Sequence, residues 1–264
     1  MGILNMTPDS FSGDGHLTGG KRALARALGA ARRMIRDGAD IIDVGGESTR
    51  PGSCAVSVQE EIARVAPVIR ALVKDGAVPV AVDTYKPEVA EAALEAGASI
   101  VNVIQGTPVS GAMLKVVRTY DAGIILMHMR GNPSTMQAKT RYRNITQDIL
   151  QALQKSVEKC LKTGIKKESI VVDPGFGFAK TVGQNLSLLK HLSAFKGLGL
   201  PVLAGVSRKS FIGKTLGVEA AQRLQGTAAS VTLAIQGGAH IIRVHDVRAM
   251  KQVALMSDAV LAAE

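Results

Sequence analysis

Eight short runs of aliphatic and β-branched residues recur along the 264-residue chain, and the intervals between them leave room for helices. The runs are GILN (2–5), DIIDV (40–44), VPVAVD (78–83), SIVNV (99–103), GIILMH (123–128), SIVVD (169–173), PVLAGV (201–206) and HIIRVH (240–245). Strands that alternate with helices build parallel sheets, and eight such units are typical of a closed barrel. We therefore predict an α/β protein with the (β/α)₈ TIM barrel fold.

The intervals carry the periodicity of amphipathic helices. One apolar stripe consists of Ile145, Ile149, Leu153, Val157 and Leu161. Several of the intervals end in a glycine just before the next run, at Gly38, Gly76, Gly97, Gly164 and Gly238. A glycine at this place fits a helix C-cap in the left-handed conformation, so helices are predicted to end there.

The chain is long enough for two small domains, but no stretch rich in Pro, Ser or charge divides it. We therefore expect residues 1–264 to form one domain. Hydrophobic residues make up 46% and aromatic residues only 3%, which favours an aliphatic core between a parallel sheet and its helices. The chain begins directly at the first predicted strand, so we expect it to lack a segment before strand one, either naturally or because it was shortened.

Membrane and disulfide-rich classes are excluded. No apolar run approaches the roughly 18 residues of a membrane span, and the start MGILNMTPDS lacks the regions of a signal peptide. The two cysteines, Cys54 and Cys160, are too few for a disulfide framework and lack metal-ligand spacing. We expect a cytoplasmic protein with reduced thiols and no membrane contact.

The net charge of +10 leaves two interpretations open. Basic residues are scattered over helical segments such as KRALARALGAARRMIR, and few aromatic residues could stack on bases. We therefore expect no nucleic-acid partner. The excess fits either a solvated basic surface or a phosphorylated substrate.

Hydrogen-bonding side chains follow the predicted strands, whose C-terminal ends face one common mouth in this fold. Guanidinium and imidazole groups suit a phosphate or diphosphate. The candidates for this role are Arg50, Arg243 and His245. Carboxylates and an amide could bind the edge of a flat, nitrogen-rich heterocycle, and these candidates are Asp83, Asn102 and Asp173. Lys209 could meet a ring carbonyl or a carboxylate.

Each of these candidates also has a simpler structural interpretation. Asp83 could cap the following helix, and Asp173 could form a turn with the Pro-Gly pair after it. His245 could bond to main chain, although Arg243 lies on the same face of its strand. We expect His128 to support the structure rather than to contact a substrate.

Seven motifs identify a family. LNMTPDSFS, DVGGESTRPG, VDTYKPEV, LMHMRGNPSTMQ, DPGFGFAKT, GVSRKSFIG and IIRVHDV, in this order, strongly resemble dihydropteroate synthase of the pterin-binding enzyme family. The resemblance covers nearly the whole chain. It implies a transferase of folate biosynthesis that condenses 6-hydroxymethyl-7,8-dihydropterin diphosphate with p-aminobenzoate, releasing pyrophosphate with the help of Mg²⁺. It also implies a homodimer, formed through late helices, and inhibition by sulfonamides.

The resemblance further implies a role for each matching residue. The pterin would be held by Asp83, Asn102, Asp173 and Lys209. The diphosphate would be held by Arg50, Arg243 and His245, with Asn5 on the Mg²⁺. The aminobenzoate site would be bordered by Thr49, Pro51, Phe178 and Ser210. Among these residues, the catalytic ones would be Lys209, Arg243, His245 and Arg50.

Two departures from the family leave other interpretations open. The family usually has Asp where this chain has Val103, so we expect weaker support of the pterin site there. The first loop reads DSFSGDGH rather than DSFSDGG. The alternatives are a pterin-binding paralogue without catalysis and a folate-dependent methyltransferase domain, although the latter has no use for an oxyanion cluster.

Overall fold

The computed structural model describes residues 1–7, 21–48, 55–104, 107–132 and 134–263. Its strands all fall on the predicted runs. They are β1 Gly2–Asn5, β2 Ile42–Gly45, β3 Val80–Asp83, β4 Ile100–Val103, β5 Gly123–Met127, β6 Ile170–Asp173, β7 Leu203–Ala204 and β8 Ile241–Ile242. The last two strands are much shorter than the runs that predicted them.

The strands close into a ring. β1 to β6 form one parallel sheet in sequence order, and β7 pairs in parallel with β8. Single bridges join the two sheets on both sides, between Val172 and Val202 and between Gly2 and Val244. The second bridge is supported by a hydrogen bond of 3.0 Å from Ile3 N to Val244 O. The predicted barrel is confirmed, with two strands too short to join the main sheet.

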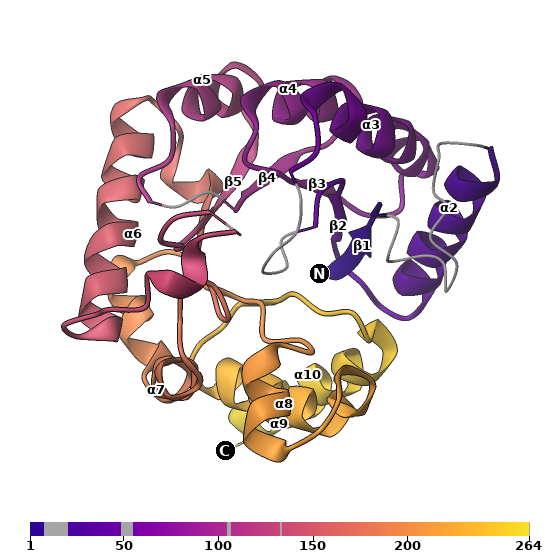
Figure 1. Ribbon diagram of the computed structural model, residues 1–264. Coiled ribbons are helices and arrows are strands. Elements are labelled where there is room, and N and C mark those ends of the chain that lie inside the picture. The colour runs from indigo at the N-terminus through magenta and orange to yellow at the C-terminus, as the bar shows by residue number, and fades with distance from the viewer. Residues whose placement is uncertain (8–20, 49–54, 105–106, 133, 264) are drawn as a thin grey trace.

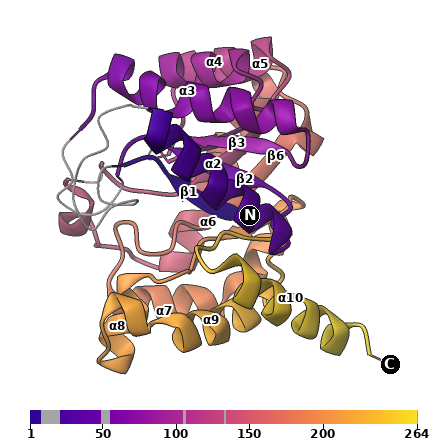
Figure 2. The same cartoon turned by 90° about the vertical axis from the view of Figure 1, so that its right-hand side faces the viewer.

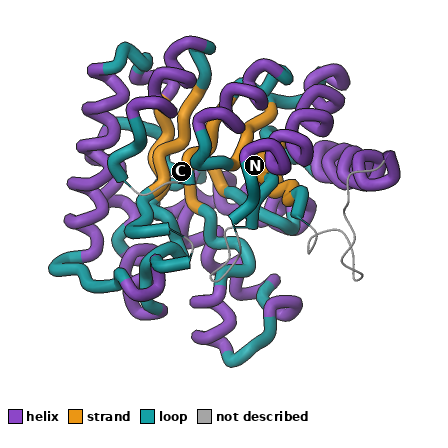
Figure 3. The backbone as a smooth tube through the Cα atoms, turned by 45° about the horizontal axis from the view of Figure 1, so that its top comes forward, coloured by secondary structure: helices purple, strands orange, loops and turns teal. Residues whose placement is uncertain are grey.

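Helices surround this ring. Figure 1 shows them following one another around it in chain order, and Figure 3 shows the orange strands inside the purple helices. The helices are α2 Lys21–Arg36, α3 Val58–Asp75, α4 Pro87–Glu95, α5 Gly111–Thr119, α6 Ile145–Lys162, α7 Val182–Lys190, α8 Ser210–Leu216, α9 Leu224–Gln236 and α10 Val247–Leu261. α10 ends in a segment that projects from the body (Figure 2). No helix in the described ranges is long and apolar enough to cross a membrane.

The predicted helix signals are largely confirmed. The apolar stripe from Ile145 to Leu161 lies wholly in α6, where Ile149 and Leu153 are fully buried and Leu161 in the last turn is 43% exposed. The glycines predicted to end helices all have positive φ; they are Gly38, Gly76, Gly97, Gly164 and Gly238. These helix ends therefore turn the chain back into the next strand, because glycine adopts the left-handed conformation without a steric cost.

Alternate residues of each strand face opposite sides of the ring. Val101 and Val103 of β4 are fully buried in the large core that includes helical residues, whereas Asn102 between them pairs with Asp43 inside the ring. Val103 therefore packs among apolar residues on the side away from Asn102, and the expected weaker support of the pterin site stays a prediction.

The inside of the ring changes from apolar to polar along its axis. Near the N-terminal ends of the strands, buried Met1, Ala81, Ile125 and Leu203 form a separate apolar cluster. Farther along the strands, the buried side chains include carboxylates and amides. The apolar cluster fills the bottom, so the polar residues gather at the C-terminal end, where barrel enzymes have their sites.

Candidate active site

A cavity of about 610 Å³ opens at the C-terminal ends of the strands. Seven of the residues singled out in the sequence line it. They are Asn5, Asp83, Phe178, Lys209, Ser210, Arg243 and His245. Residues from the first strand and the last therefore meet at one mouth. Thr49, Arg50 and Pro51 lie outside the described residues. The stretch DSFSGDGH of the first loop, which differs from the family pattern, also lies outside them.

A buried polar cluster forms the floor of this mouth. Arg243 donates from Nε to Asp43 Oδ2 at 2.6 Å and from Nη2 to Asp83 Oδ2 at 2.6 Å. Asn102 Nδ2 donates to Asp43 Oδ2 at 3.0 Å. The guanidinium is thus held between two carboxylates, and only its remaining N–H groups are left for an anion. The sequence had suggested that Arg243 serves the diphosphate alone.

Among the described residues, three oxygens of this cluster have no hydrogen-bond partner. They are Oδ1 of Asp43, Asp83 and Asn102, and all three are buried. Buried acceptors are nearly always satisfied, so a group of three calls for further donors, such as those of a bound ligand. Burial raises the pKa of Asp83, although Arg243 opposes this shift. The cluster is suited to a flat ligand that presents several N–H groups.

Lys209 lies between the aromatic side of the mouth, at Phe178, and the carboxylate side, at Asp83 and Asp173. Its Nζ lies 4.1 Å from the centroid of the Phe178 ring. Burial lowers its pKa to about 8, with Arg243 adding to the shift and Asp173 and Asp83 opposing it. The side chain therefore stands between an aromatic surface and the carboxylates, as a residue that contacts two adjacent ligands would.

His245 is fixed by a serine that sequence reasoning missed. Ser207 Oγ accepts from His245 N at 3.2 Å and lies 3.1 Å from His245 Nδ1. Burial and then Arg243 lower the pKa of His245 to about 4, so the imidazole is neutral at pH 7. If Ser207 donates to Nδ1, the ring proton is on Nε2, and the residue contributes a hydrogen bond rather than a charge.

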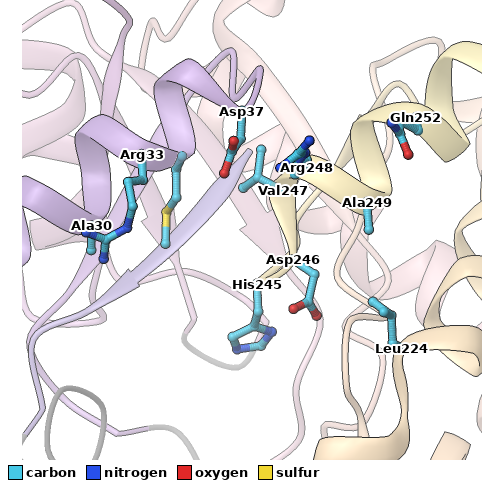
Figure 4. Close-up of a pocket in the computed structure, with 11 residues that line it drawn as sticks. Ala30, Arg33, Asp37, Leu224, His245, Asp246, Val247, Arg248, Ala249 and Gln252 are labelled. Atoms are coloured by element: carbon cyan, nitrogen blue, oxygen red, sulfur yellow. The ribbon is translucent and has the colours of Figure 1, made fainter.

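A second groove lies on the outer side of His245, between α2 and α10 (Figure 4). Its volume is about 480 Å³, and it is lined by Arg33, Asp37, Asp246 and Arg248 among others. Of the predicted site residues that the structure describes, His245 alone borders it. The mouth, which collects residues from all around the ring, is therefore the stronger candidate.

A buried ion-pair network holds the chain where it leaves β2. Lys86 Nζ lies 2.7 Å from Glu47 Oε2 and 2.6 Å from Glu61 Oε2. Glu47 also accepts from Val56 N at 3.0 Å, so it connects the two described ends of the segment around residues 49–54. Thr84 donates to Glu61 Oε1 at 2.8 Å. The ends of that segment are therefore tied to α3 and to the N-cap of α4.

We expect Lys86→Met to destabilise the fold by about 3–5 kcal/mol, because it leaves two buried carboxylates without their cation. Urea unfolding measures the loss. The control is Lys74→Met, which changes an exposed lysine of α3 and should stay close to the wild type. A difference below about 1 kcal/mol between the two variants would show that the network carries little stability.

The loop after β6 contains a buried lysine that the sequence did not single out. Lys180 is 4% exposed, and its Nζ lies 3.3 Å from Nδ1 of the buried His128. Burial lowers the pKa of His128 to about 2, with Lys180 next in importance, so the imidazole is neutral. His128 thus contacts the buried amine of Lys180, and its predicted structural role stays a prediction.

We expect His128 to make stability depend on pH. Its pKa is lowered on folding, so the unfolded chain binds the proton first, and stability is lost as pH falls below 6.5. Between pH 7 and pH 5 the wild type should lose about 2 kcal/mol more than His128→Gln. Urea unfolding at both pH values measures this. The control His191→Gln, which replaces an exposed histidine, should behave as the wild type. If the free energy of unfolding changes with pH equally in His128→Gln and the wild type, the prediction is contradicted.

Several residues of the mouth were missed in the sequence. Asp43 is fully buried, two residues before the end of β2, so its alternation with Gly45 could have placed it inside the ring. Arg208 and Arg223 line the mouth; Arg208 lies within the motif GVSRKSFIG, whereas the sequence context of Arg223 resembles that of an ordinary surface arginine. Arg208 is held by Asp246, with Nε 2.8 Å from Oδ2. Only the motif could have singled out Arg208, and no sequence signal distinguishes Arg223 from a solvated arginine.

Comparison with known proteins agrees with the motifs. The family model of the pterin binding enzyme matches residues 1–245. A dihydropteroate synthase of Synechocystis is 47% identical over 260 residues, which is 98% of this chain and 89% of that protein. Among solved structures, dihydropteroate synthase of Clostridium difficile in the presence of pteroic acid has a TM-score of 0.92 at 44% identity, with 99% of this chain and 96% of that chain covered. The Yersinia pestis enzyme with a sulfonamide drug has a TM-score of 0.92 at 43% identity, with 99% and 94% covered.

Proposed function

Because the chain belongs to the pterin-binding enzyme family, we propose that its mouth condenses 6-hydroxymethyl-7,8-dihydropterin diphosphate with p-aminobenzoate. The products are 7,8-dihydropteroate and pyrophosphate, and the protein is a transferase of folate biosynthesis. The observation that carries the proposal is a trio of buried oxygens, on Asp43, Asp83 and Asn102, that have no partner in the part of the chain that the structure describes. The amino and ring N–H groups of a pterin are the donors that such a trio would satisfy.

The pterin would lie on the polar floor. Asp83 and Asn102 would accept from its N–H groups, and Lys209 would meet its ring carbonyl. Asp173 is buried, and its Oδ1 accepts from Gly175 N at 2.7 Å, which fixes the carboxylate at the end of β6. The solved relative with pteroic acid supports this assignment, since pteroic acid joins a pterin to p-aminobenzoate.

The diphosphate would extend toward Asn5, His245 and the remaining N–H groups of Arg243, with Arg50 as a further ligand. Gly45 keeps this corner open, because a Cβ there would lie 3.6 Å from both Asn5 Oδ1 and Asp83 Oδ2. An amide oxygen beside a carboxylate fits Mg²⁺, which takes few protein ligands and several from phosphates and water. Asn5 would hold the ion, and bound Mg²⁺ would supply charge that stabilises the leaving diphosphate.

The proposed reaction depends on how the site stabilises the charges that develop when the diphosphate leaves. As the C–O bond to the diphosphate breaks, negative charge grows on the leaving group and positive charge on the pterin methylene. Arg243 and the Nε2 hydrogen of His245 would stabilise the first, while Asp83 and Asp173 would stabilise the second. The amine of p-aminobenzoate then attacks the methylene carbon and loses its proton. An arylamine attacks as the free base, so positioning matters more than a strong general base.

The aminobenzoate would lie against Phe178, with Ser210 near its carboxylate and Thr49 and Pro51 on the side of the second loop. Phe178 is 8% exposed and faces the mouth beside Lys209. A sulfonamide has the same aryl amine, and a solved relative binds such a drug. We therefore propose that sulfonamides inhibit this protein in competition with p-aminobenzoate.

The proposal is tested by mixing the protein with both substrates and Mg²⁺ and by following pyrophosphate and dihydropteroate in the same reaction. Equal amounts of the two products, both abolished by Asp173→Ala, are the expected result. Pterin binding without either product would favour the non-catalytic paralogue. Binding of methyltetrahydrofolate in preference to the pterin diphosphate would favour the methyltransferase domain.

The proposal includes a homodimer formed through the late helices. α9 and α10 carry large exposed apolar side chains, namely Leu233, Leu255, Met256, Val260 and Leu261. Residues of the two helices also line an apolar groove of about 690 Å³. A surface of this kind on two adjacent helices suits a second copy of the chain. A cytoplasmic location is also proposed and fits the free, buried thiol of Cys160.

We expect Met256→Glu to convert the dimer into a monomer, because it places a charge in the centre of the apolar surface. Light scattering during size-exclusion chromatography measures the mass. Arg248→Glu, on an exposed part of α10 outside the apolar groove, should leave the mass at twice that of the chain. A wild-type mass of one chain would contradict the prediction.

A further inference from the structure

The loop between β6 and α7 adopts an unusual backbone. Within residues 174–180, Gly175, Gly177 and Ala179 have φ angles of 73°, 83° and 51°. Alanine in the left-handed region costs about 1–2 kcal/mol. A loop with such a conformation persists only where its surroundings hold it in place.

Lys180 supplies part of that support, beside Asn185, whose Oδ1 accepts from Gly177 N at 2.7 Å. The buried Nζ of Lys180 donates to Gly175 O at 2.8 Å and to Phe178 O at 2.9 Å, and it lies 3.3 Å from His128 Nδ1. Within the described residues, its hydrogen bonds thus go to two main-chain carbonyls and to an imidazole rather than to a carboxylate. One amine therefore ties two turns of the loop to the end of β5.

The attachment to β5 is tight and independent of the amine's charge. A Cβ on Gly175 would lie 2.1 Å from His128 O, so the loop backbone runs directly along the residue after β5. Burial lowers the pKa of Lys180 to about 7, although Asp173 opposes the shift. A neutral amine still donates two hydrogen bonds, so the tie holds in either protonation state.

The two ends of this loop serve different parts of the mouth. At its start, Asp173 is fixed by Gly175 N without the help of Lys180. At its far end, the carbonyl of Phe178 is bound directly by the amine, and the Phe178 ring lies under Lys209 Nζ. The lysine therefore acts more strongly on the aromatic side of the mouth than on the carboxylate side.

We propose that Lys180 is a positioning residue for the second substrate, which holds Phe178 in place so that the aryl amine can lie against its ring. This inference rests on the proposed function and deepens it. Lys180 itself does not line the mouth and touches no reacting atom. Its effect passes through the main chain of residues 175–178.

The test is Lys180→Met, which keeps most of the side-chain volume and removes the donor. Its KM for p-aminobenzoate should rise about ten- to a hundredfold, while its KM for the pterin diphosphate changes less than about threefold. Lys190→Met, at an exposed position of α7, is the control and should match the wild type in both constants. Equal increases in both KM values would overturn the proposal.

Hydrogen exchange of the peptide 174–180 provides a readout that needs no activity. Lys180→Met should exchange these amides at least about tenfold faster than the wild type or Lys190→Met, because the loop loses two of its bonds. Unchanged exchange would overturn the proposal. If Lys180→Met does not fold, Lys180→Gln, which cannot span the same distance, gives the same comparison. Failure of the wild type to form dihydropteroate would refute the proposed function, whereas the exchange result still decides whether Lys180 holds the loop.

Discussion

The Arg243→Met variant will lose both stability and activity. It leaves Asp43 and Asp83 buried without the guanidinium that lies 2.6 Å from each. Removing one member of a buried ion pair costs about 3–5 kcal/mol. Turnover should fall on the order of 10²–10³-fold in the protein that remains folded, because a cation facing the leaving group is lost.

The loss of stability in Arg243→Met should depend on pH. Burial raises the pKa of Asp83 even in the wild type, and without Arg243 the shift becomes larger. The wild-type pKa of Asp83 is about 7, so below pH 7 this carboxyl is protonated in both folded proteins and does not change the deficit. The deficit should grow as pH rises above about 7, where Asp83 ionises beside Arg243 in the wild type but stays protonated in the variant. Urea unfolding at pH 5 and pH 8 measures this, with the exposed Arg248→Met as control. A deficit that is equal at both pH values would contradict the assignment of these charges.

The Lys209→Met variant will remain folded but lose most of its activity. Lys209 lies in the mouth, over the Phe178 ring and near Asp173 and Asp83, and no ion pair within 4 Å is described for it. Its removal therefore leaves no directly paired carboxylate, unlike that of Arg243. We expect kcat/KM for the pterin diphosphate to fall about 10²–10³-fold, since a hydrogen bond from a buried cation is lost.

Steady-state kinetics with each substrate varied in turn measures the effect of Lys209→Met. Lys214→Met, on the exposed side of α8, is the matched control and should retain wild-type constants. Thermal unfolding should show similar midpoints for both variants. Activity of Lys209→Met within tenfold of the wild type would remove this residue from the proposed catalytic group.

The fold was largely predictable because each of its eight units repeats the same local signals. Apolar runs predict the strands, and glycines such as Gly38 predict where helices end, since both depend on neighbouring residues only. The lengths of β7 and β8 were not predictable. Whether Val202 or Val244 belongs to a strand or to a single bridge depends on hydrogen bonds with segments far away in the sequence.

The site was predictable where a polar residue ends a strand, as Asp83 and Asp173 do, because barrel geometry brings such residues together. The partners of Arg243 were not predictable, since the bond to Asp43 spans 200 positions of the chain. Lys180 was missed for a related reason. Its amine serves carbonyls of its own loop, and a sequence does not show which way a lysine turns.

The central claim is that the polar floor and Phe178 together form one site for a pterin and an aryl amine. A crystal structure of this protein with pteroic acid tests it most directly. The account predicts pterin N–H groups within hydrogen-bond distance of Asp83 Oδ1 and Asn102 Oδ1, with the aminobenzoate ring against Phe178. A ligand bound instead in the groove between α2 and α10, with both oxygens still unpartnered, would contradict it.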